Sequence, residues 1–234
     1  MEEEEIADQL VGVIFQVPGP LDEDGRATYV TADEYLSGNV RQKLREAEDA
    51  AEMSPYFDVN VQALKAAQPK DLEASEIDVR LGATWVDKKY INEFMYETFQ
   101  TPFYMKRSIK VNFSAYTAEW FIDGKSLMSM NNVAAYVTYG TDRANAYRIL
   151  EDTLNLRDIR IYDTVQDAEG KEKRVLNQKE TTLAQQKQQA IKEAFRDWIW
   201  KDPDRREDLV KTYNELFNSI RPGSLTVVIS PLTG

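Results

Sequence analysis

The stretch IKVNFSAYTAEWFIDG, residues 109–124, decides the fold class of this chain. Apolar and polar side chains alternate from Ile109 to Phe113, which is typical of a strand with one buried face. The run from Trp120 to Ile122 indicates a second strand, and Asp123-Gly124 is a turn signal. These residues therefore predict a short antiparallel strand pair in a chain whose other segments are mostly helical in pattern.

A second strand pair is expected further along, where Arg160 to Val165 and Lys173 to Leu176 bracket QDAEGKE as a hairpin with an exposed tip. Helical spacing and capping residues predict the remaining elements. Helices are expected from Glu2 to about Val13, around Leu36 to Ala51 after a capping box at Thr31 and Glu34, from an N-cap at Asp87 to before Pro102, from about Asp142 to Asn155, from Thr181 or Thr182 to about Lys201, and from Asp202-Pro203 to about Ser219. The predicted fold class is α+β, predominantly α-helical with small antiparallel strand pairs.

The composition excludes several classes of site. Apolar residues make up 42% of the 234 and aromatic residues 11%, which is enough for a packed core. The chain has no cysteine and no histidine, so thiolate sites and histidine-based catalysis are impossible. We expect no metal and no cofactor. The acidic start and the lack of an apolar run of about 18 residues predict a cytoplasmic protein without a membrane partner.

The net charge of −11 is unevenly distributed along the chain. Residues 1–80 carry 19 acidic and 7 basic side chains, whereas residues 81–234 carry 21 acidic and 22 basic ones. The acidic excess therefore belongs to the first third, so the chain as a whole would be repelled by nucleic acid but its larger C-terminal part would not be. We expect an acidic N-terminal helical segment over 1–80, an α+β accessory domain with C-terminal helices over 81–222, and a separate tail over 223–234.

The stretch YLSGNVRQKL, residues 35–44, places Gly38-Asn39 inside or at a break of a predicted helix. A glycine within a helix costs about 1 kcal/mol relative to alanine, so it needs a reason. One interpretation is close packing of another backbone against Gly38. The other is a helix break that turns backbone amides and the side chains of Arg41, Lys43 and Arg45 toward a phosphate.

A search for catalytic motifs finds none that is complete. The chain lacks a G-x-x-x-x-G-K-[ST] phosphate loop and a G-x-S-x-G nucleophile elbow. SPYF at residues 54–57 matches only part of the S/D/N-P-P-aromatic motif of DNA methyltransferases, and we interpret it as a turn. Glu151 and Asp152 are adjacent on a predicted helix and point in different directions, so they do not form a paired acid–base site.

Basic residues near aromatic ones form the second candidate site. Phe103 and Tyr104 precede three cations, and a nucleic-acid groove combines aromatic platforms with cations in this way. Acidic residues are interleaved throughout, so an ordinary mixed surface is the alternative. Together with the first cluster, the candidate nucleic-acid-binding residues are Arg41, Lys43, Arg45, Lys106, Arg107 and Lys110.

Four long stretches resemble one family of proteins: YVTADEYLSGNVRQKLREAEDAA, AAQPKDLEASEIDVRLGATWVDKKYINEFMYETF, TYGTDRANAYRILEDTLNLRDIRIYD and ETTLAQQKQQAIKEAFRDWIWKDP. The family comprises the very large helicase and DNA-methyltransferase proteins of conjugative elements and phages, which are similar to fusions of an adenine-specific DNA methyltransferase with a Swi/Snf-type helicase. The resemblance extends from about Ile6 to Pro222. It implies that this chain corresponds to the region that connects the methyltransferase to the helicase. Both enzymes' motifs are absent here, so the resemblance transfers no catalytic residue.

The residues after Pro222 do not resemble the family's continuation, so we expect a truncated gene product or an isolated domain. The resemblance implies a non-catalytic accessory module that contacts DNA or orients the helicase. The alternative is a docking or structural linker module without DNA contact, and an independent enzyme ranks third because the motifs are missing. The expected partners are DNA and the neighbouring helicase and methyltransferase domains of the parent protein.

Overall fold

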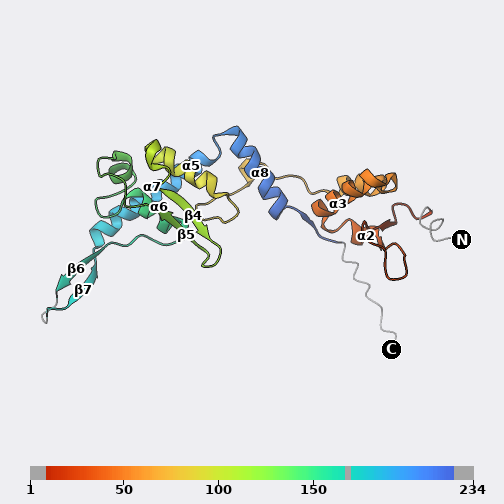
Figure 1. The fold of residues 1–234 in the computed structure, drawn as a ribbon, viewed down its shortest axis with the longest axis horizontal. Coiled ribbons are helices and arrows are strands. Elements are labelled where there is room, and N and C mark those ends of the chain that lie inside the picture. The colour runs from red at the N-terminus through yellow and green to blue at the C-terminus, as the bar shows by residue number, and fades with distance from the viewer. Residues whose placement is uncertain (1–8, 167–169, 224–234) are drawn as a thin grey trace, which may run out of the picture. The chain divides into compact units, whose positions relative to one another are not determined.

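The computed structural model describes residues 9–166 and 170–223 of the chain (Figure 1). These residues divide into two compact units. Unit 1 combines the described residues up to Glu73 with those from Lys211 onward, and unit 2 comprises Ala74–Val210. These units are defined by backbone contacts alone. The division into domains 1–80, 81–222 and 223–234 therefore stays a prediction from the sequence.

The α+β fold class predicted from the sequence is confirmed, with helices over about half of the chain. The helices are α2 Ala32–Tyr35, α3 Val40–Met53, α4 Asp58–Ala67, α5 Lys88–Thr98, α6 Ala146–Leu154, α7 Gln178–Ile199 and α8 Pro203–Phe217, with 3-10 turns η1 Pro55–Phe57, η2 Ala74–Glu76 and η3 Phe103–Met105 and a π-helical segment η4 Ala134–Thr138. The strands are β1 Ile14–Gln16, β2 Tyr29–Thr31, β3 Gly38–Asn39, β4 Lys110–Ser114, β5 Glu119–Asp123, β6 Tyr162–Gln166, β7 Glu172–Leu176 and β8 Ile220–Arg221. Within the described residues they pair as four two-stranded antiparallel sheets, β1–β2, β3–β8, β4–β5 and β6–β7.

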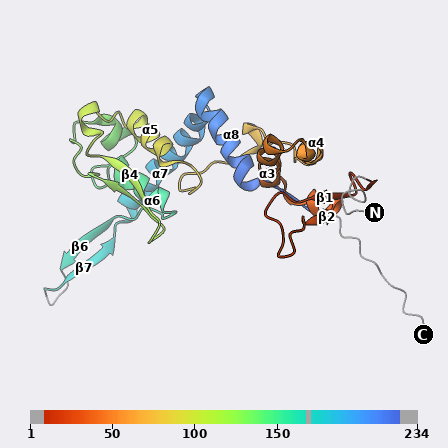
Figure 2. The same cartoon turned by 45° about the vertical axis from the view of Figure 1, so that its right-hand side comes forward.

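Unit 1 has a small core between helices α3 and α4 and the β1–β2 pair (Figure 2). The rings of Phe15 and Tyr35 stack with centroids 4.9 Å apart, and Leu64 of α4 is fully buried. Asn60 is also buried, and its amide donates to the Tyr35 hydroxyl at 2.9 Å. The same amide donates to the Gln16 carbonyl at 2.8 Å, so the core combines apolar burial with a satisfied buried amide.

The helix predicted around Leu36 to Ala51 is wrong in its first part. The chain leaves α2 after Tyr35, pairs β3 with β8, and begins α3 only at Val40. Gly38 has a φ of +72°, and a Cβ at this position would have no atom within 4 Å. The close-packing interpretation is therefore wrong, because the glycine is required by its left-handed backbone conformation.

Substitutions of Gly38 should report this backbone requirement rather than side-chain volume. We expect Gly38→Ala and Gly38→Leu to lower the stability of unit 1 by the same amount, about 1–2 kcal/mol, since both carry the left-handed penalty. Gly38→Asn should be milder, because asparagine tolerates positive φ. Hydrogen exchange of the α3 amides measures the change, and a leucine variant much less stable than the alanine variant would contradict it.

In unit 2, α5 packs against β4 and α6 against β5, while α7 packs against both α5 and α6 (Figure 1). Phe94 of α5 is completely buried, and its ring contacts the rings of Phe195 and Trp198 edge-on. Two side chains at the end of α6 bond to β5: Glu151 of the helix accepts from the Ile122 amide at 2.7 Å, and the C-cap residue Asn155 accepts from the Trp120 amide at 2.8 Å. The hairpin is thus fixed by both apolar and polar contacts.

The β6–β7 ribbon projects from the rest of unit 2 in both views (Figures 1 and 2). Every residue of β7 is exposed, and so are the last three residues of β6. At its base Arg143 donates to the Asp163 carboxylate at 2.8 Å and to the Tyr162 carbonyl at 2.9 Å. The bond to Arg143 lowers the pKa of Asp163, so this ion pair persists to lower pH than it would with an unperturbed aspartate.

Several predicted helix starts need correction. Helix α6 begins at Ala146 rather than near Asp142, because Asn145 accepts from the Arg148 amide at 3.1 Å and caps it. Helix α7 begins at Gln178, where Asn177 is the cap. Thr181, one of two predicted caps for α7, is instead buried within it and bonds to the backbone of Ile161.

The caps predicted at Thr31, Asp87 and Asp202 are confirmed, since each side chain accepts from an amide of the first helical turn. Helix α4 and the π-helical η4 are not in the sequence-based prediction. The helix predicted from Glu2 falls mostly outside the described residues, and Ile14–Gln16 is a strand. In the part of the chain that the structure describes, no helix has the length and apolar composition of a membrane span.

Candidate nucleic-acid interface

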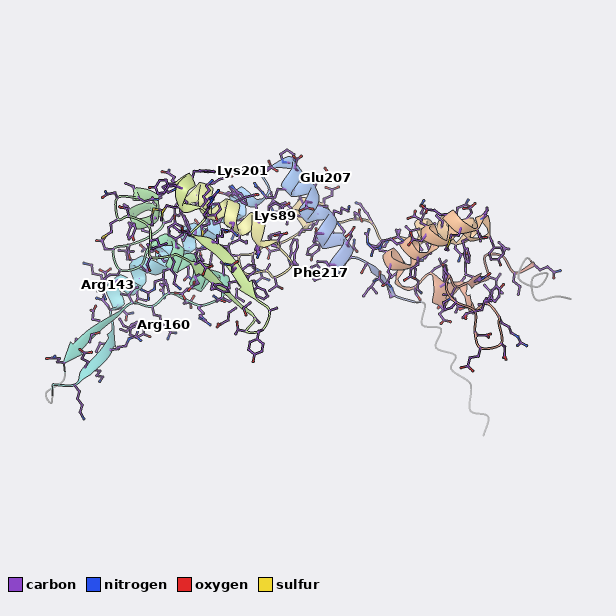
Figure 3. The ribbon with its side chains drawn as sticks, in the orientation of Figure 1. Lys89, Arg143, Arg160, Lys201, Glu207 and Phe217 are labelled. Carbon is purple, nitrogen blue, oxygen red and sulfur yellow. The ribbon has the colours of Figure 1, made fainter. Side chains whose placement is uncertain are left out.

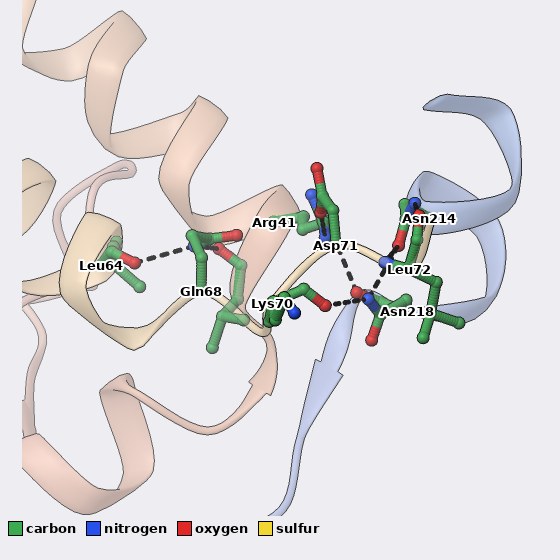
Figure 4. Close-up of polar contacts among 9 residues, drawn as sticks. Arg41, Leu64, Gln68, Lys70, Asp71, Leu72, Asn214 and Asn218 are labelled. Carbon is green, nitrogen blue, oxygen red and sulfur yellow. Dashed lines mark hydrogen bonds and ion pairs between the residues drawn. The ribbon is translucent and has the colours of Figure 1, made fainter. Parts of the chain in front are cut away.

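The first predicted cluster includes two cations with internal partners. The Arg41 Nε atom donates to the Asn218 carbonyl at 2.8 Å, and the guanidinium also pairs with Asp71 (Figure 4). The Lys43 ammonium donates to three carbonyls of residues 34–37, at 2.9, 3.0 and 2.9 Å. The side chains of Arg41 and Lys43 therefore stabilise unit 1 through contacts within it.

The helix break does not assemble the predicted phosphate site from all three cations. Asn39 caps α3 by accepting from the Gln42 amide at 3.0 Å, which occupies one of the amides at the break. Arg45 is exposed and makes no polar contact with the described residues. Of the three predicted cations in this cluster, only Arg45 presents an unpaired charge to solvent.

The second cluster lies on η3 and the turn into β4. The Phe103 and Tyr104 rings are 85% and 77% exposed, which is unusual for large aromatic side chains. Beside them, the Lys106 ammonium lies 5.2 Å from the Tyr96 ring, and Arg107 is exposed without a polar side-chain contact in the described residues. We call Phe103, Tyr104, Lys106, Arg107 and Lys110 the aromatic–basic surface.

The loop that carries this surface is braced from below. The Tyr96 hydroxyl lies 3.0 Å from the Lys106 carbonyl and 2.8 Å from the Ile109 carbonyl, and its one hydrogen is shared between these two acceptors. Burial raises the pKa of the Tyr96 phenol, so it remains a donor at neutral pH. Asn92 accepts from the Val111 amide at 2.9 Å and donates to the Val111 carbonyl at 3.2 Å.

Two further contacts fix the ends of the loop. Gly124 has a φ of +63°, and a Cβ there would lie 2.4 Å from the Ser108 carbonyl oxygen. The turn after β5 therefore packs directly on the loop backbone. On the other side the Thr101 hydroxyl lies 2.7 Å from that of Tyr147, whose pKa is raised to about 12 by burial. A rigid support of this kind keeps binding side chains in one geometry.

Three other basic residues of unit 2, Arg143, Lys187 and Arg205, make internal contacts. Figure 3 shows Arg143 and Arg160 near the base of the β6–β7 ribbon, where Arg143 pairs with Asp163. Lys187 donates to the Val137 carbonyl at 2.7 Å, and Arg205 is buried. No group of acidic side chains among the described residues is arranged to hold a metal ion. Exposed rings beside cations are groups that can stack on bases and pair with phosphates.

Residues 80–219 match the model of one protein family, a domain of unknown function (DUF8437). The match includes 140 of the 234 residues, which is more than half of the chain. The chain belongs to the DUF8437 family. All five residues of the aromatic–basic surface lie within the DUF8437 segment, whereas Arg41, Lys43 and Arg45 precede it. No curated protein and no solved structure matches the chain.

Unit 2 also contains a pocket that was not predicted from the sequence, lined mostly by residues of the DUF8437 segment. It is lined by residues from three separate segments, 78–81, 153–158 and 188–196. None of these segments contains a recognisable binding motif. The packing of α6 on α7 brings two of the three segments together, so the sequence offered no local signal for the pocket.

Proposed function

We propose that this chain is a non-catalytic accessory module of a mobile-element helicase and DNA methyltransferase, and that its aromatic–basic surface contacts DNA. The observation that carries the proposal is the pair of exposed rings, Phe103 and Tyr104, beside cations on a braced loop. The resemblance to helicase–methyltransferase fusions supports DNA as the partner. The DUF8437 match by itself names no activity.

The surface favours single-stranded over duplex DNA. Exposed rings can stack on bases that are already unstacked, whereas duplex bases are covered by their neighbours. Lys106, Arg107 and Lys110 lie close enough in the chain to follow one phosphate backbone. In this role the module would hold a displaced strand near the helicase of the parent protein.

Two sets of substitutions test the surface. Phe103→Ala with Tyr104→Ala should weaken single-strand binding about tenfold or more, because each stacked base contributes about 1–3 kcal/mol. Changing Lys106, Arg107 and Lys110 to alanine should flatten the slope of log affinity against log salt by roughly 2, since each single-strand phosphate contact adds about 0.7. Fluorescence anisotropy with a labelled strand across a salt series measures both changes.

A matched control removes the same charge elsewhere. Lys201, Arg206 and Lys211 are exposed, so their triple alanine variant should keep the slope of the wild-type chain. Tyr116→Ala removes a ring that is 99% exposed and lies away from η3 in sequence, and binding should survive it. Equal losses in the controls and the surface variants, or no salt-dependent binding to either DNA form, would end the proposal.

The docking alternative has an observation of its own. Leu127, Met130 and Val133 are 59%, 66% and 63% exposed. Their segment is tied to the loop before η3, because Asn132 donates to the Phe99 carbonyl at 2.9 Å. Such exposed apolar side chains favour contact with a neighbouring domain of the parent protein. Co-purification with the helicase domain of the parent protein, abolished by Met130→Ser with Val133→Ser, would support docking.

A further inference from the structure

The pocket of unit 2 has a volume of about 390 Å³, which is in the range of small-ligand sites. Its walls are the segment 78–81, the end of α6 with the turn that follows, and one side of α7. The side chains of Val79, Leu81 and Phe195 line it and are themselves buried in the core. The inner wall is therefore apolar and fixed.

Leu156 lies at the rim of this pocket and has both an unusual backbone conformation and an unusual exposure. Its φ is +57°, a left-handed conformation that glycine or asparagine normally adopts at the end of a helix. Its side chain is also 81% exposed. Neither backbone preference nor burial within this chain explains a leucine here. Contact with a bound ligand would explain it, because strained residues collect at ligand sites.

The rim of the pocket carries a positive excess. Lys192 and Arg196 lie one turn apart on α7, are exposed, and make no ion pair with the described residues. Arg80 and Arg157 add two cations, which pair with Asp78 at 3.3 Å and with Glu119 respectively. Asp78 and Asp158 are the acidic residues of the lining, so cations outnumber acids at the rim and an anion is favoured there. Lys192 and Arg196 are the two of these cations that have no acidic partner among the described residues.

A buried amide gives the inner wall one polar group. Gln188 is 3% exposed, and its Nε2 atom donates to the Arg157 carbonyl at 2.7 Å and to the Thr153 hydroxyl at 3.1 Å. Its Oε1 atom accepts one bond, from the Ile159 amide at 3.3 Å. An amide oxygen has two lone pairs, so Oε1 retains acceptor capacity for a ligand that donates.

We propose that this pocket binds a nucleoside monophosphate, either free or as the 5′-terminal nucleotide of a strand. The phosphate pairs with Lys192 and Arg196, and the base lies against the apolar wall under Leu156. A base with an exocyclic amine, such as adenine, can donate toward Gln188. The inference goes beyond the proposed function and does not depend on the aromatic–basic surface.

Calorimetric titration of the full chain with dAMP, deoxyadenosine and inorganic phosphate tests the cations. Lys192→Gln with Arg196→Gln should weaken dAMP binding about tenfold or more, because each charge-assisted bond is worth more than a neutral one. Deoxyadenosine should bind the wild-type and variant chains alike, because it has no phosphate. No saturable binding of dAMP to the wild-type chain, or unchanged affinity in the double variant, would overturn the proposal.

Leu156→Gly separates binding from folding. Removing the left-handed strain should leave the melting temperature unchanged or higher, while loss of the leucine side chain weakens dAMP binding about fivefold. An unchanged affinity would show that Leu156 does not contact the nucleotide. A lower melting temperature would show that leucine at this position stabilises the fold. Either result would overturn the proposal. Inorganic phosphate that competes as well as dAMP would do the same, because it would leave only an anion site.

The two sources of the nucleotide are distinguished by short oligonucleotides. If the occupant is a strand end, a 5′-phosphorylated strand should compete with dAMP more strongly than the same strand with a 5′-hydroxyl. If it is free nucleotide, the two strands should compete equally weakly. Phe103→Ala with Tyr104→Ala should leave dAMP affinity unchanged in both cases, so failure of the DNA-contact surface and failure of this pocket give different results. A loss of dAMP affinity in that double variant would place the nucleotide on the aromatic–basic surface and overturn the assignment to this pocket.

Discussion

Arg205→Ala should lower the free energy of unfolding of unit 2 by about 3–5 kcal/mol, the largest effect that we expect from one substitution. The Arg205 side chain is only 9% exposed, and its guanidinium carbon lies 3.4 Å from the centroid of the Trp198 ring. It also donates to the Ile199 carbonyl at 2.9 Å and the Trp198 carbonyl at 2.8 Å. The alanine variant loses a desolvated cation–π contact and two charge-assisted bonds at the end of α7.

Tryptophan fluorescence during urea unfolding measures this loss, because all four tryptophans of the chain lie in unit 2. Arg205→Lys should fall between the wild type and the alanine variant, since lysine keeps the charge but not the planar fork of donors. Arg206→Ala is the matched control, because Arg206 is exposed and should change stability by less than about 0.5 kcal/mol. Similar losses in the two alanine variants would refute the role of Arg205.

Asn214→Ala should lower the stability of unit 1 by about 2–4 kcal/mol, because it leaves two backbone groups without partners. Asn214 is 2% exposed; its Oδ1 atom accepts from the Leu72 amide at 2.9 Å, and its Nδ2 atom donates to the Leu72 carbonyl at 3.0 Å (Figure 4). Asn218 extends the contact by donating to the Lys70 carbonyl at 2.8 Å. One amide side chain thus pairs with Leu72 as a neighbouring strand would.

Hydrogen exchange of the Leu72 amide is the direct measurement, and Glu215→Ala at the next, exposed position is the control. Asn214→Asp tests the direction in which stability changes with pH. Burial and the facing Leu72 carbonyl should raise the pKa of that carboxyl in the folded state above its unfolded value. The variant should therefore be least stable at neutral pH and recover as the pH falls through the raised pKa, because the protonated acid can donate again. A pH-independent loss would contradict this account.

Local elements were predictable wherever a few adjacent residues set them. Thr31, Asp87 and Asp202 cap their helices as expected, because an N-cap side chain bonds to amides two or three residues away. The β4–β5 pair was equally predictable from its alternation. Gly38 was misinterpreted, because its left-handed conformation accompanies pairing with Arg221, which is remote in sequence. Thr181 was taken as a possible helix cap for a similar reason, since its hydroxyl bonds to the distant Ile161 backbone.

The sequence determined which residue types could contact DNA, and the tertiary structure decided which of them remain available. Arg41 and Arg107 have the same side chain in comparably mixed neighbourhoods. Arg41 is committed to Asn218, 177 positions away, whereas Arg107 is exposed. Local sequence fixes charge, caps and strand alternation because those interactions span a few residues. Partners and pockets join residues that are far apart in the chain, so only the packed fold determines them.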